Sequence, residues 1–250
     1  MQSVRQQFEI PVAYHFQVVV AGGGPAGVMA AIASARSGAK TLLIERANCA
    51  GGIWTSGMLS WMLDVANKDG IVRELMDRLE AQNEGYYGRG SGFIAFPEAV
   101  KRELDSMLAQ AGVHVFYYTQ FVDALVEGNR ITHAIIESKA GRQAVEGEIF
   151  IDATGDGDLA ARAGCQFQIG MPDNGQTQPS SLIGIMTGVH AASSRPFNNT
   201  LPYQEDRSAK ERLLQEMKRA GITPSYRAPS FFHIADDIWL VMTTHGYQTN

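Results

Sequence analysis

The chain has 250 residues, of which 45% are apolar and 19% charged, and its formal net charge is −5. This length allows one large domain, or one domain and part of another, with a core that needs neither disulfides nor metals. The acidic balance argues against a nucleic-acid partner, because such a protein needs a basic face for the phosphates. The two cysteines, Cys49 and Cys165, form no CxxC pair, which predicts a reducing, cytoplasmic setting.

One window near the N-terminus has the hydropathy of a membrane span. Residues 16–35 carry no charge, and a stretch of about 20 such residues is long enough to cross a bilayer. Gly22–Pro25 lie in its middle, however, and would break a membrane helix. The residues before the window show no apolar signal segment. We therefore predict a buried strand, turn and helix here, and no membrane partner.

A strand–helix–strand unit is predicted at residues 17–45. Residues 17–21 are a β-branched run typical of a buried strand, and residues 40–45 form a second strand. Between them lies a helix of small residues, 28–37, which Gly38 ends. The unit spans about 30 residues, the length of a βαβ motif, and so predicts two parallel strands with a crossover helix.

The turn between the first strand and the helix has the sequence GGGPAG, a GxGxxG fingerprint. Gly22 permits the tight turn, Gly24 lets the backbone approach a pyrophosphate, and Gly27 lets helix and strand pack closely. The helix that follows Pro25 and Ala26 offers free N–H groups and the positive end of its dipole to phosphates. This arrangement predicts a dinucleotide-binding turn; the alternative is a tight turn without a nucleotide.

A carboxylate follows the fingerprint at the expected distance. Glu45 ends the second strand, 18 residues after Gly27, where a carboxylate accepts hydrogen bonds from an adenosine ribose. Arg46 then precedes a loop that contains Gly51 and Gly52. A nicotinamide-dependent dehydrogenase normally passes from this strand into a helix, whereas a glycine loop lets the backbone lie close along a longer cofactor. The loop therefore favours FAD, although a Gly-Gly pair alone can be a plain turn.

The middle of the chain changes from helices to short strands. Apolar spacing predicts amphipathic helices over residues 70–82 and 97–111, the second with Pro97 in its first turn. A buried strand is predicted at residues 113–117. Short strands separated by turn residues then predict an antiparallel meander. The meander strands are residues 119–126, 130–137 and 142–145.

A further strand at residues 148–153 runs into the sequence DATGDGD. Open α/β sheets bind ligands at the carboxyl ends of their strands. After Thr154, Gly155 would permit close approach there, and Asp156 could accept a hydrogen bond from a ligand hydroxyl. The alternative is a strand-end turn in which Asp158 caps a short helix. We favour the ligand-binding interpretation.

After Gly164 the pattern loosens. The remaining predicted elements are a loop at 171–180, a strand at 182–189, a helix at 209–219 and two strands within 230–244. The predicted fold class is α/β. A Rossmann-like FAD-binding domain with a mostly parallel sheet and a β-meander covers residues 1–160, and residues 161–250 begin a second, α+β substrate or cap domain.

Several separated motifs carry a resemblance to a known family. They are IPVAYHFQVVVAGGGPAG, the ER…GG stretch, LDSMLAQAGVHVFYYT, the meander, IDATGDGDLAARAG and the later QTQP. Together they resemble the bacterial FAD-dependent oxidoreductase family of the glutathione-reductase-like flavoprotein superfamily. The resemblance covers roughly residues 9–190 and is specific because it rests on several motifs rather than one.

The resemblance implies FAD as the cofactor and a role for each matching residue. Gly22–Gly27 and Gly51–Gly52 would contact the pyrophosphate and the flavin side. Glu45 and Arg46 would hold the adenosine, and the backbone of Val122 would contact the adenine. The remaining implied contacts are Thr154, Gly155 and Asp156 along the cofactor, and Thr55 and Gln178 near the isoalloxazine.

The sequence departs from the family in one respect. Members usually return at the C-terminus with a strand, a turn and a helix that close the flavin pocket. We do not find that segment before Asn250. We therefore expect the chain to be a piece of a longer protein or to lack part of the pocket.

The predicted function is an FAD-dependent oxidoreductase that transfers a hydride or two electrons between a small organic substrate and flavin. No side chain stands out as a catalytic acid or base, and the histidine and cysteine spacings predict no metal site. The sequence does not indicate the substrate, the electron acceptor or the oligomeric state. An NAD(P)-dependent dehydrogenase and a non-catalytic FAD-binding module are the alternatives.

Overall fold

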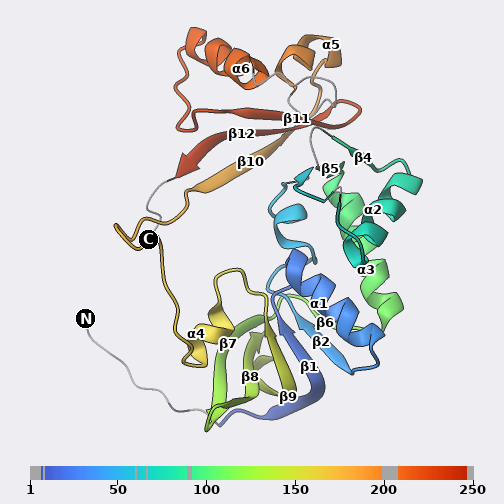
Figure 1. The fold of residues 1–250 in the computed structure, drawn as a ribbon, viewed down its shortest axis with the longest axis vertical. Coiled ribbons are helices and arrows are strands. Elements are labelled where there is room, and N and C mark those ends of the chain that lie inside the picture. The colour runs from blue at the N-terminus through green and yellow to red at the C-terminus, as the bar shows by residue number, and fades with distance from the viewer. Residues whose placement is uncertain are drawn as a thin grey trace. The chain divides into compact units, whose positions relative to one another are not determined.

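A computed structural model describes residues 7, 9–59, 61–65, 67–88, 92–198 and 208–246 (Figure 1). The chain divides into two units. The first consists of Met1–Gly52 and Leu104–Gln166, and the second of Ile53–Glu103 and Phe167–Asn250. The GxGxxG turn, Glu45 and the end of the strand that precedes DATGDGD therefore all belong to the first unit.

A six-stranded sheet forms the centre of the first unit, in the order β6-β2-β1-β9-β8-β7. Its strands are β1 (Val12–Ala21), β2 (Thr41–Ile44), β6 (His114–Phe116), β7 (Gln120–Glu127), β8 (Arg130–Ser138) and β9 (Gly141–Asp152). β1 pairs in parallel with β2 and β9, and β2 with β6, whereas β8 pairs antiparallel with β7 and β9. This sheet confirms the predicted fold class, a parallel sheet with an antiparallel meander.

Strand β9 corrects the prediction of two short strands at 142–145 and 148–153. It is continuous over 12 residues, and it pairs antiparallel with β8 and in parallel with β1. Gly147, in the predicted gap, lies opposite Phe16, and a Cβ there would be 2.7 Å from the ring of Phe150. This glycine therefore marks close packing within a strand rather than a break. Through β9 the meander and the parallel strands become one sheet.

The core of the first unit joins the parallel strands to the meander. One apolar cluster contains Phe16 and Val19 of β1, Leu42 of β2, Ile136 of β8 and Leu159 of α4 (Asp158–Arg162). Each such side chain contributes about 1.5–3 kcal/mol when it is fully buried. Helix α1 (Pro25–Arg36) packs against β1 and β2 (Figure 1). This packing fixes the start of α1 at the carboxyl end of β1, where the fingerprint lies.

Within the described residues, the second unit has two three-stranded antiparallel sheets, β3-β5-β4 and β10-β12-β11. Their strands are β3 (Trp61–Met62), β4 (Gly85–Tyr87), β5 (Phe93–Ala95), β10 (Ser180–Met186), β11 (Ser230–Ala235) and β12 (Ile238–Gly246). An apolar cluster of Ile94, Phe232 and Leu240 joins the two sheets. The hydroxyl of Tyr86 donates to the carbonyl of His233 at 3.1 Å. The two sheets therefore share one core.

Apart from η1, which precedes β3, the described helices of the second unit lie between these strands along the chain. They are η1 (Gly52–Trp54), α2 (Ile71–Ala81), α5 (Ala191–Ser194), η2 (Arg195–Phe197) and α6 (Ser208–Arg219), with α3 (Pro97–Ala111) shared between the units. Among the described residues, no helix combines the length and the apolar composition that a membrane crossing needs.

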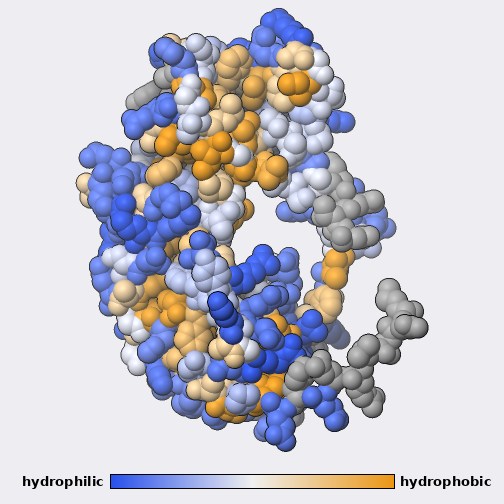
Figure 2. Space-filling model, turned by 180° about the vertical axis from the view of Figure 1, so that it is seen from behind, coloured by the Kyte–Doolittle hydropathy of each residue, from blue (hydrophilic) through white to orange (hydrophobic). Residues whose placement is uncertain are grey.

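Strand β10 is an edge strand with apolar side chains in solvent. Leu182, Ile185 and Met186 are exposed, Leu182 by 76%. Figure 2 shows hydrophobic residues gathered on the surface of the upper part of the view, where this sheet lies. The strand contains no charged residue and no proline, the features that commonly protect an edge. Among the described residues no strand pairs with the outer edge of β10.

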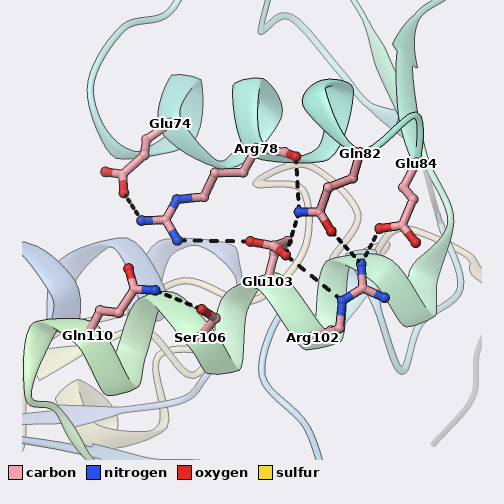
Figure 3. Close-up of polar contacts among 8 residues, drawn as sticks. All are labelled: Glu74, Arg78, Gln82, Glu84, Arg102, Glu103, Ser106 and Gln110. Carbon is pink, nitrogen blue, oxygen red and sulfur yellow. Dashed lines mark hydrogen bonds and ion pairs between the residues drawn. The ribbon is translucent and has the colours of Figure 1, made fainter.

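Helices α2 and α3 confirm the two amphipathic helices predicted from the sequence. Besides apolar contacts, a polar network joins them (Figure 3). Glu103 of α3 is 7% exposed and accepts a hydrogen bond from the side chain of Gln82 at 2.8 Å. The guanidinium of Arg78 lies 3.9 Å from the same carboxylate. Because a buried carboxylate is costly without partners, the network fixes how the two helices pack.

Replacing Glu103 by alanine should lower the free energy of unfolding by about 1–3 kcal/mol, because Gln82 and Arg78 lose a buried partner. Glu103→Gln is the matched control. Its amide oxygen can still accept from Gln82, so we expect a smaller loss, about 0.5–1.5 kcal/mol. Urea denaturation of the parent and both variants measures the effect. Equal stability of Glu103→Ala and the parent would show that the network does not stabilise the fold.

Candidate dinucleotide-binding site

Two of the fingerprint glycines are required by close packing. Gly22 has a φ of +96°, which glycine adopts without strain, and a Cβ there would lie 2.3 Å from the carbonyl oxygen of Ala153. A Cβ on Gly27 would lie 1.8 Å from the carbonyl oxygen of Gly22. The carboxyl end of β1, the start of α1 and the end of β9 therefore meet at these glycines.

Gly24 has a different environment, because a Cβ there would meet no atom within 4 Å. It is the N-cap of α1 and is followed by Pro25 and Ala26. In the part of the chain that the structure describes, no side chain caps this N-terminus, and the first turn has no acidic residue. Unpaired N–H groups and the positive end of the dipole thus lie beside open space, an arrangement that binds phosphate.

Glu45, directly after β2, holds the fingerprint loop through its carboxylate. Oε2 accepts the N–H of Gly23 and Oε1 accepts the N–H of Ala47, both at 2.6 Å. Glu45 is buried, at 8% exposed, whereas its neighbour Arg46 is exposed. A carboxylate has roughly four acceptor positions, of which these bonds take two. Glu45 can therefore hold the loop and still accept hydrogen bonds from a ligand hydroxyl.

The loop after β2 returns to the fingerprint, as the sequence suggested. The N–H of Gly51 donates to the carbonyl of Gly23 at 2.8 Å. A Cβ on Gly52 would lie 2.9 Å from the Cα of Gly24. The predicted ER…GG stretch and the GxGxxG turn therefore form one continuous backbone surface.

The end of β9 lies beside the same turn. The N–H of Ala153 donates to the carbonyl of Ala21 at 2.8 Å. Gly155 has open space where a Cβ would be, and Asp156 is exposed. The hydroxyl of Thr154 is engaged within the chain, because it accepts the N–H of Asp158 at 2.8 Å. Gly155 and Asp156 thus remain accessible for the predicted ligand contact.

Asp152 organises this turn, a role that the sequence analysis did not assign. Its Oδ1 accepts the N–H of Thr154 at 3.0 Å and the hydroxyl of Thr154 at 2.7 Å, and its Oδ2 accepts the N–H of Ala160 at 2.8 Å. Burial raises the pKa of Asp152, but the hydrogen bonds outweigh it and hold the pKa below the ordinary value of 3.8. The sequence feature that could have indicated this role is an acidic residue two positions before a threonine at the end of a strand.

Val122 lies at an irregularity in β7. The register with β8 shifts between Phe121 and Asp123, which makes Val122 the extra residue of a β-bulge. The start of β7 is tied to the end of β2, because the N–H of Thr119 donates to the carbonyl of Glu45 at 3.0 Å. The backbone of Val122, which is predicted to contact adenine, thus lies where the hydrogen-bond pairing of β7 with β8 is interrupted. The strand that carries it begins next to Glu45.

Thr55 and Gln178 belong to the second unit. Thr55 is fully buried just after η1, and Gln178 is exposed in the segment before β10. The structure therefore brings together the fingerprint, Glu45, the Gly51–Gly52 pair and the end of β9. The predicted places of Thr55 and Gln178 near the isoalloxazine stay predictions.

A family model described as FAD dependent oxidoreductase matches residues 17–248. The chain belongs to that family. The match confirms the FAD-dependent oxidoreductase family predicted from the sequence, and with it the cofactor, FAD. The site fits this cofactor: an uncapped helix N-terminus suits a pyrophosphate, a carboxylate with spare acceptor positions suits a ribose, and Gly24 leaves room for close approach.

Curated relatives of this member of the FAD dependent oxidoreductase family come from archaea and other organisms. Thiamine thiazole synthase of Pyrococcus horikoshii is 29% identical in an alignment of 158 residues that covers 58% of this chain and 59% of the relative. Digeranylgeranylglycerophospholipid reductase of Methanocella arvoryzae is 26% identical in an alignment of 136 residues that covers 46% of this chain and 33% of the relative. The chain thus spans less than two thirds of the length of either protein.

Solved structures share the fold. A geranylgeranyl bacteriochlorophyll reductase-like protein of Thermoplasma acidophilum is similar with a TM-score of 0.62 at 17% identity. The superposition covers 93% of this chain and 57% of the chain of that protein. A myxobacterial chondrochloren halogenase, a variant of FAD-dependent halogenases, has a TM-score of 0.60 at 17% identity, with 94% and 53% covered. At these identities the likeness confirms the Rossmann-like fold class.

Gly27 and Gly24 form a matched pair, because a side chain at Gly27 should disturb packing, whereas a side chain at Gly24 should enter open space. Gly27→Ala should lower the free energy of unfolding by about 1–3 kcal/mol or more, because its Cβ overlaps the Gly22 carbonyl. Gly24→Ala should change it by less than about 0.5 kcal/mol, because the space is open and its φ of −68° suits any residue. Thermal denaturation of the two variants without FAD measures both values, and equal losses would contradict the assignment.

The lowered pKa of Asp152 predicts a stability that depends on pH. A carboxyl with a depressed pKa stabilises the fold above its unfolded pKa, and this contribution is lost as the pH falls through the folded pKa. Asp152→Asn should therefore be less stable than the parent at pH 7, by about 1–3 kcal/mol. The difference should narrow once the pH falls below the ordinary value of 3.8. Urea midpoints at several pH values measure it, and a constant difference down to acid pH would refute the role.

Proposed function

We propose that the chain binds FAD along the fingerprint loop and serves the exchange of a hydride or two electrons with a small organic substrate. The observation that carries the proposal is the uncapped N-terminus of α1, open at Gly24 and bordered by Glu45 and by the Gly51–Gly52 loop. When bound, the flavin supplies the redox chemistry. The chain's own residues bind and orient it.

Each residue around the loop has a separate proposed role. The N-terminus of α1, from Gly24 through Pro25 and Ala26, would receive the pyrophosphate, with Gly22 and Gly27 shaping the turn. Glu45 would accept hydrogen bonds from the ribose hydroxyls while it holds Gly23 and Ala47. The remaining proposed contacts are Arg46, Gly51, Gly52, Val122, Thr154, Gly155 and Asp156, with Thr55 and Gln178 near the isoalloxazine.

We further propose the division of roles predicted from the sequence, with residues 1–160 for FAD and residues 161–250 as the start of a substrate or cap domain. The change from the first unit to the second after Gln166 supports a boundary in this region, although Ile53–Glu103 also belong to the second unit. The glutathione-reductase-like superfamily, a bacterial source, a cytoplasmic location and a small-molecule substrate stay predictions. The relatives' own reactions, thiazole synthesis and isoprenoid lipid reduction by their names, suggest small organic substrates to assay first.

Reconstitution with FAD separates this proposal from its two alternatives. The purified chain, incubated with FAD and desalted, should show the flavin absorption bands, whereas NAD(H) should not bind at comparable concentration. Anaerobic bleaching of those bands by candidate substrates would then separate an oxidoreductase from a non-catalytic FAD-binding module. A chain that binds NAD(H) in preference to FAD would overturn the cofactor assignment.

Two substitutions test the proposed contacts directly. Glu45→Gln places an amide where two N–H donors converge, so at least one loses its acceptor, and FAD affinity should fall by about 1–3 kcal/mol. Gly24→Val should weaken binding further, because its side chain would fill the space beside the helix N-terminus. Isothermal titration with FAD measures both, with Glu127→Gln, at the exposed far end of β7, as a control. Parent-like affinity in both variants would remove this site assignment.

A further inference from the structure

Tyr118 combines two properties that the fold itself does not need. Its φ is +51°, in the left-handed region that a bulky residue adopts only with strain. Its side chain is also in solvent, because the residue is 71% exposed. The ring therefore adds nothing to the core, while the tyrosine strains the backbone. Strained residues that persist in this way cluster at ligand-binding and active sites.

The residues on either side of Tyr118 hold it in this position. The hydroxyl of Tyr117 donates to the carboxylate of Asp105 on α3. Thr119 is 5% exposed, and its hydroxyl donates to the carbonyl of Tyr117 at 3.0 Å. With both neighbours anchored and only Tyr118 exposed, the segment between β6 and β7 displays one aromatic ring on a fixed backbone.

Two backbone hydrogen bonds place the backbone of Tyr118 and Thr119 beside the Glu45–Ala47 segment. The N–H of Tyr118 donates to the carbonyl of Ala47 at 3.1 Å, and the N–H of Thr119 donates to the carbonyl of Glu45 at 3.0 Å. These acceptors flank Arg46, which is exposed. A tyrosine ring and a guanidinium are both planar groups that stack on nucleobases. The backbones that carry these two side chains therefore lie side by side at the end of the site proposed for adenosine.

We infer that Tyr118 binds the adenine base of FAD by stacking, and that the strained turn exists to present its ring. The inference rests on the proposed function and deepens it, because it names a side chain that selects the adenine half of the cofactor. The carboxylate of Glu45 and the helix N-terminus recognise ribose and phosphate, so neither reads the base. Tyr118 supplies that recognition, and the site should favour FAD over flavins that lack adenine.

Tyr118→Gly separates strain from binding. Glycine accepts a φ of +51°, so the variant without ligand should melt at a higher temperature than the parent. Its affinity for FAD and for ADP should fall about tenfold, the effect of losing one base–aromatic stack. Its affinity for FMN, which has no adenine, should stay within about twofold of the parent, since stacking on adenine is the only contact removed. Tyr118→Phe keeps the ring and should keep the affinity for FAD.

Asn83→Gly is the matched control, because Asn83 is also exposed with a positive φ, +58°, but lies in the second unit. It should leave FAD and ADP binding unchanged. If Tyr118→Gly misfolds, Tyr118→Asn tolerates the same backbone without an aromatic ring and should show the same tenfold loss. Parent-like FAD and ADP affinity in a folded Tyr118→Gly or Tyr118→Asn would overturn this inference alone. A parent that binds neither FAD nor ADP would overturn the proposed function and this inference with it.

Discussion

Three segments of the first unit meet at Glu45, and the geometry of the site depends on its hydrogen bonds. Its carboxylate holds Gly23 of the fingerprint and Ala47 of the following loop, while its carbonyl holds Thr119 before β7. The contact also explains why Gly23 is a glycine, although the GxGxxG pattern allows any residue at that position. A Cβ on Gly23 would lie 2.8 Å from Oε2 of Glu45, so only glycine allows the short bond. One buried residue thus aligns the turn and the loop through its carboxylate and the start of the meander through its backbone carbonyl.

The structure confirms the sequence-based predictions where local chemistry decides the outcome. Helix α3 has the predicted bounds, because Pro97, the apolar spacing and the glycine after Ala111 all act within a few residues. The dinucleotide turn is recognisable for the same reason. The prediction of two strands within β9 is wrong, because Gly147 read along the sequence alone resembles a turn residue between strands. Close packing accounts for this glycine, because a Cβ there would lie 2.7 Å from the ring of Phe150 and 3.0 Å from the side chain of Val19 on β1.

Other features of the site have no signature in the sequence. A positive φ at Tyr118 depends on its bond to Ala47 and on the bonds of its neighbours to Glu45 and Asp105, which are distant along the chain. The three hydrogen bonds of Asp152 likewise depend on where α4 begins relative to β9. Residue identity gives the possible partners of a polar group, whereas the fold decides which of them it meets. For this reason the sequence pointed to Glu45 but gave no role to Asp152 or Tyr118.

The residues of the site separate into two physical classes. Gly22, Gly27 and Asp152 are engaged with the protein's own backbone, so changes there act on folding first. Gly24 has open space where a Cβ would be, and the side chain of Tyr118 is exposed, so side-chain changes at these two positions act on a ligand first. Glu45 belongs to both classes, because two of its acceptor positions hold the loop and the others stay available. Such a shared residue couples the order of the loop to cofactor binding. A ribose bound at Glu45 would stabilise the carboxylate position that keeps Gly23 in place. Conversely, a loop that is already ordered loses less conformational entropy when the cofactor binds.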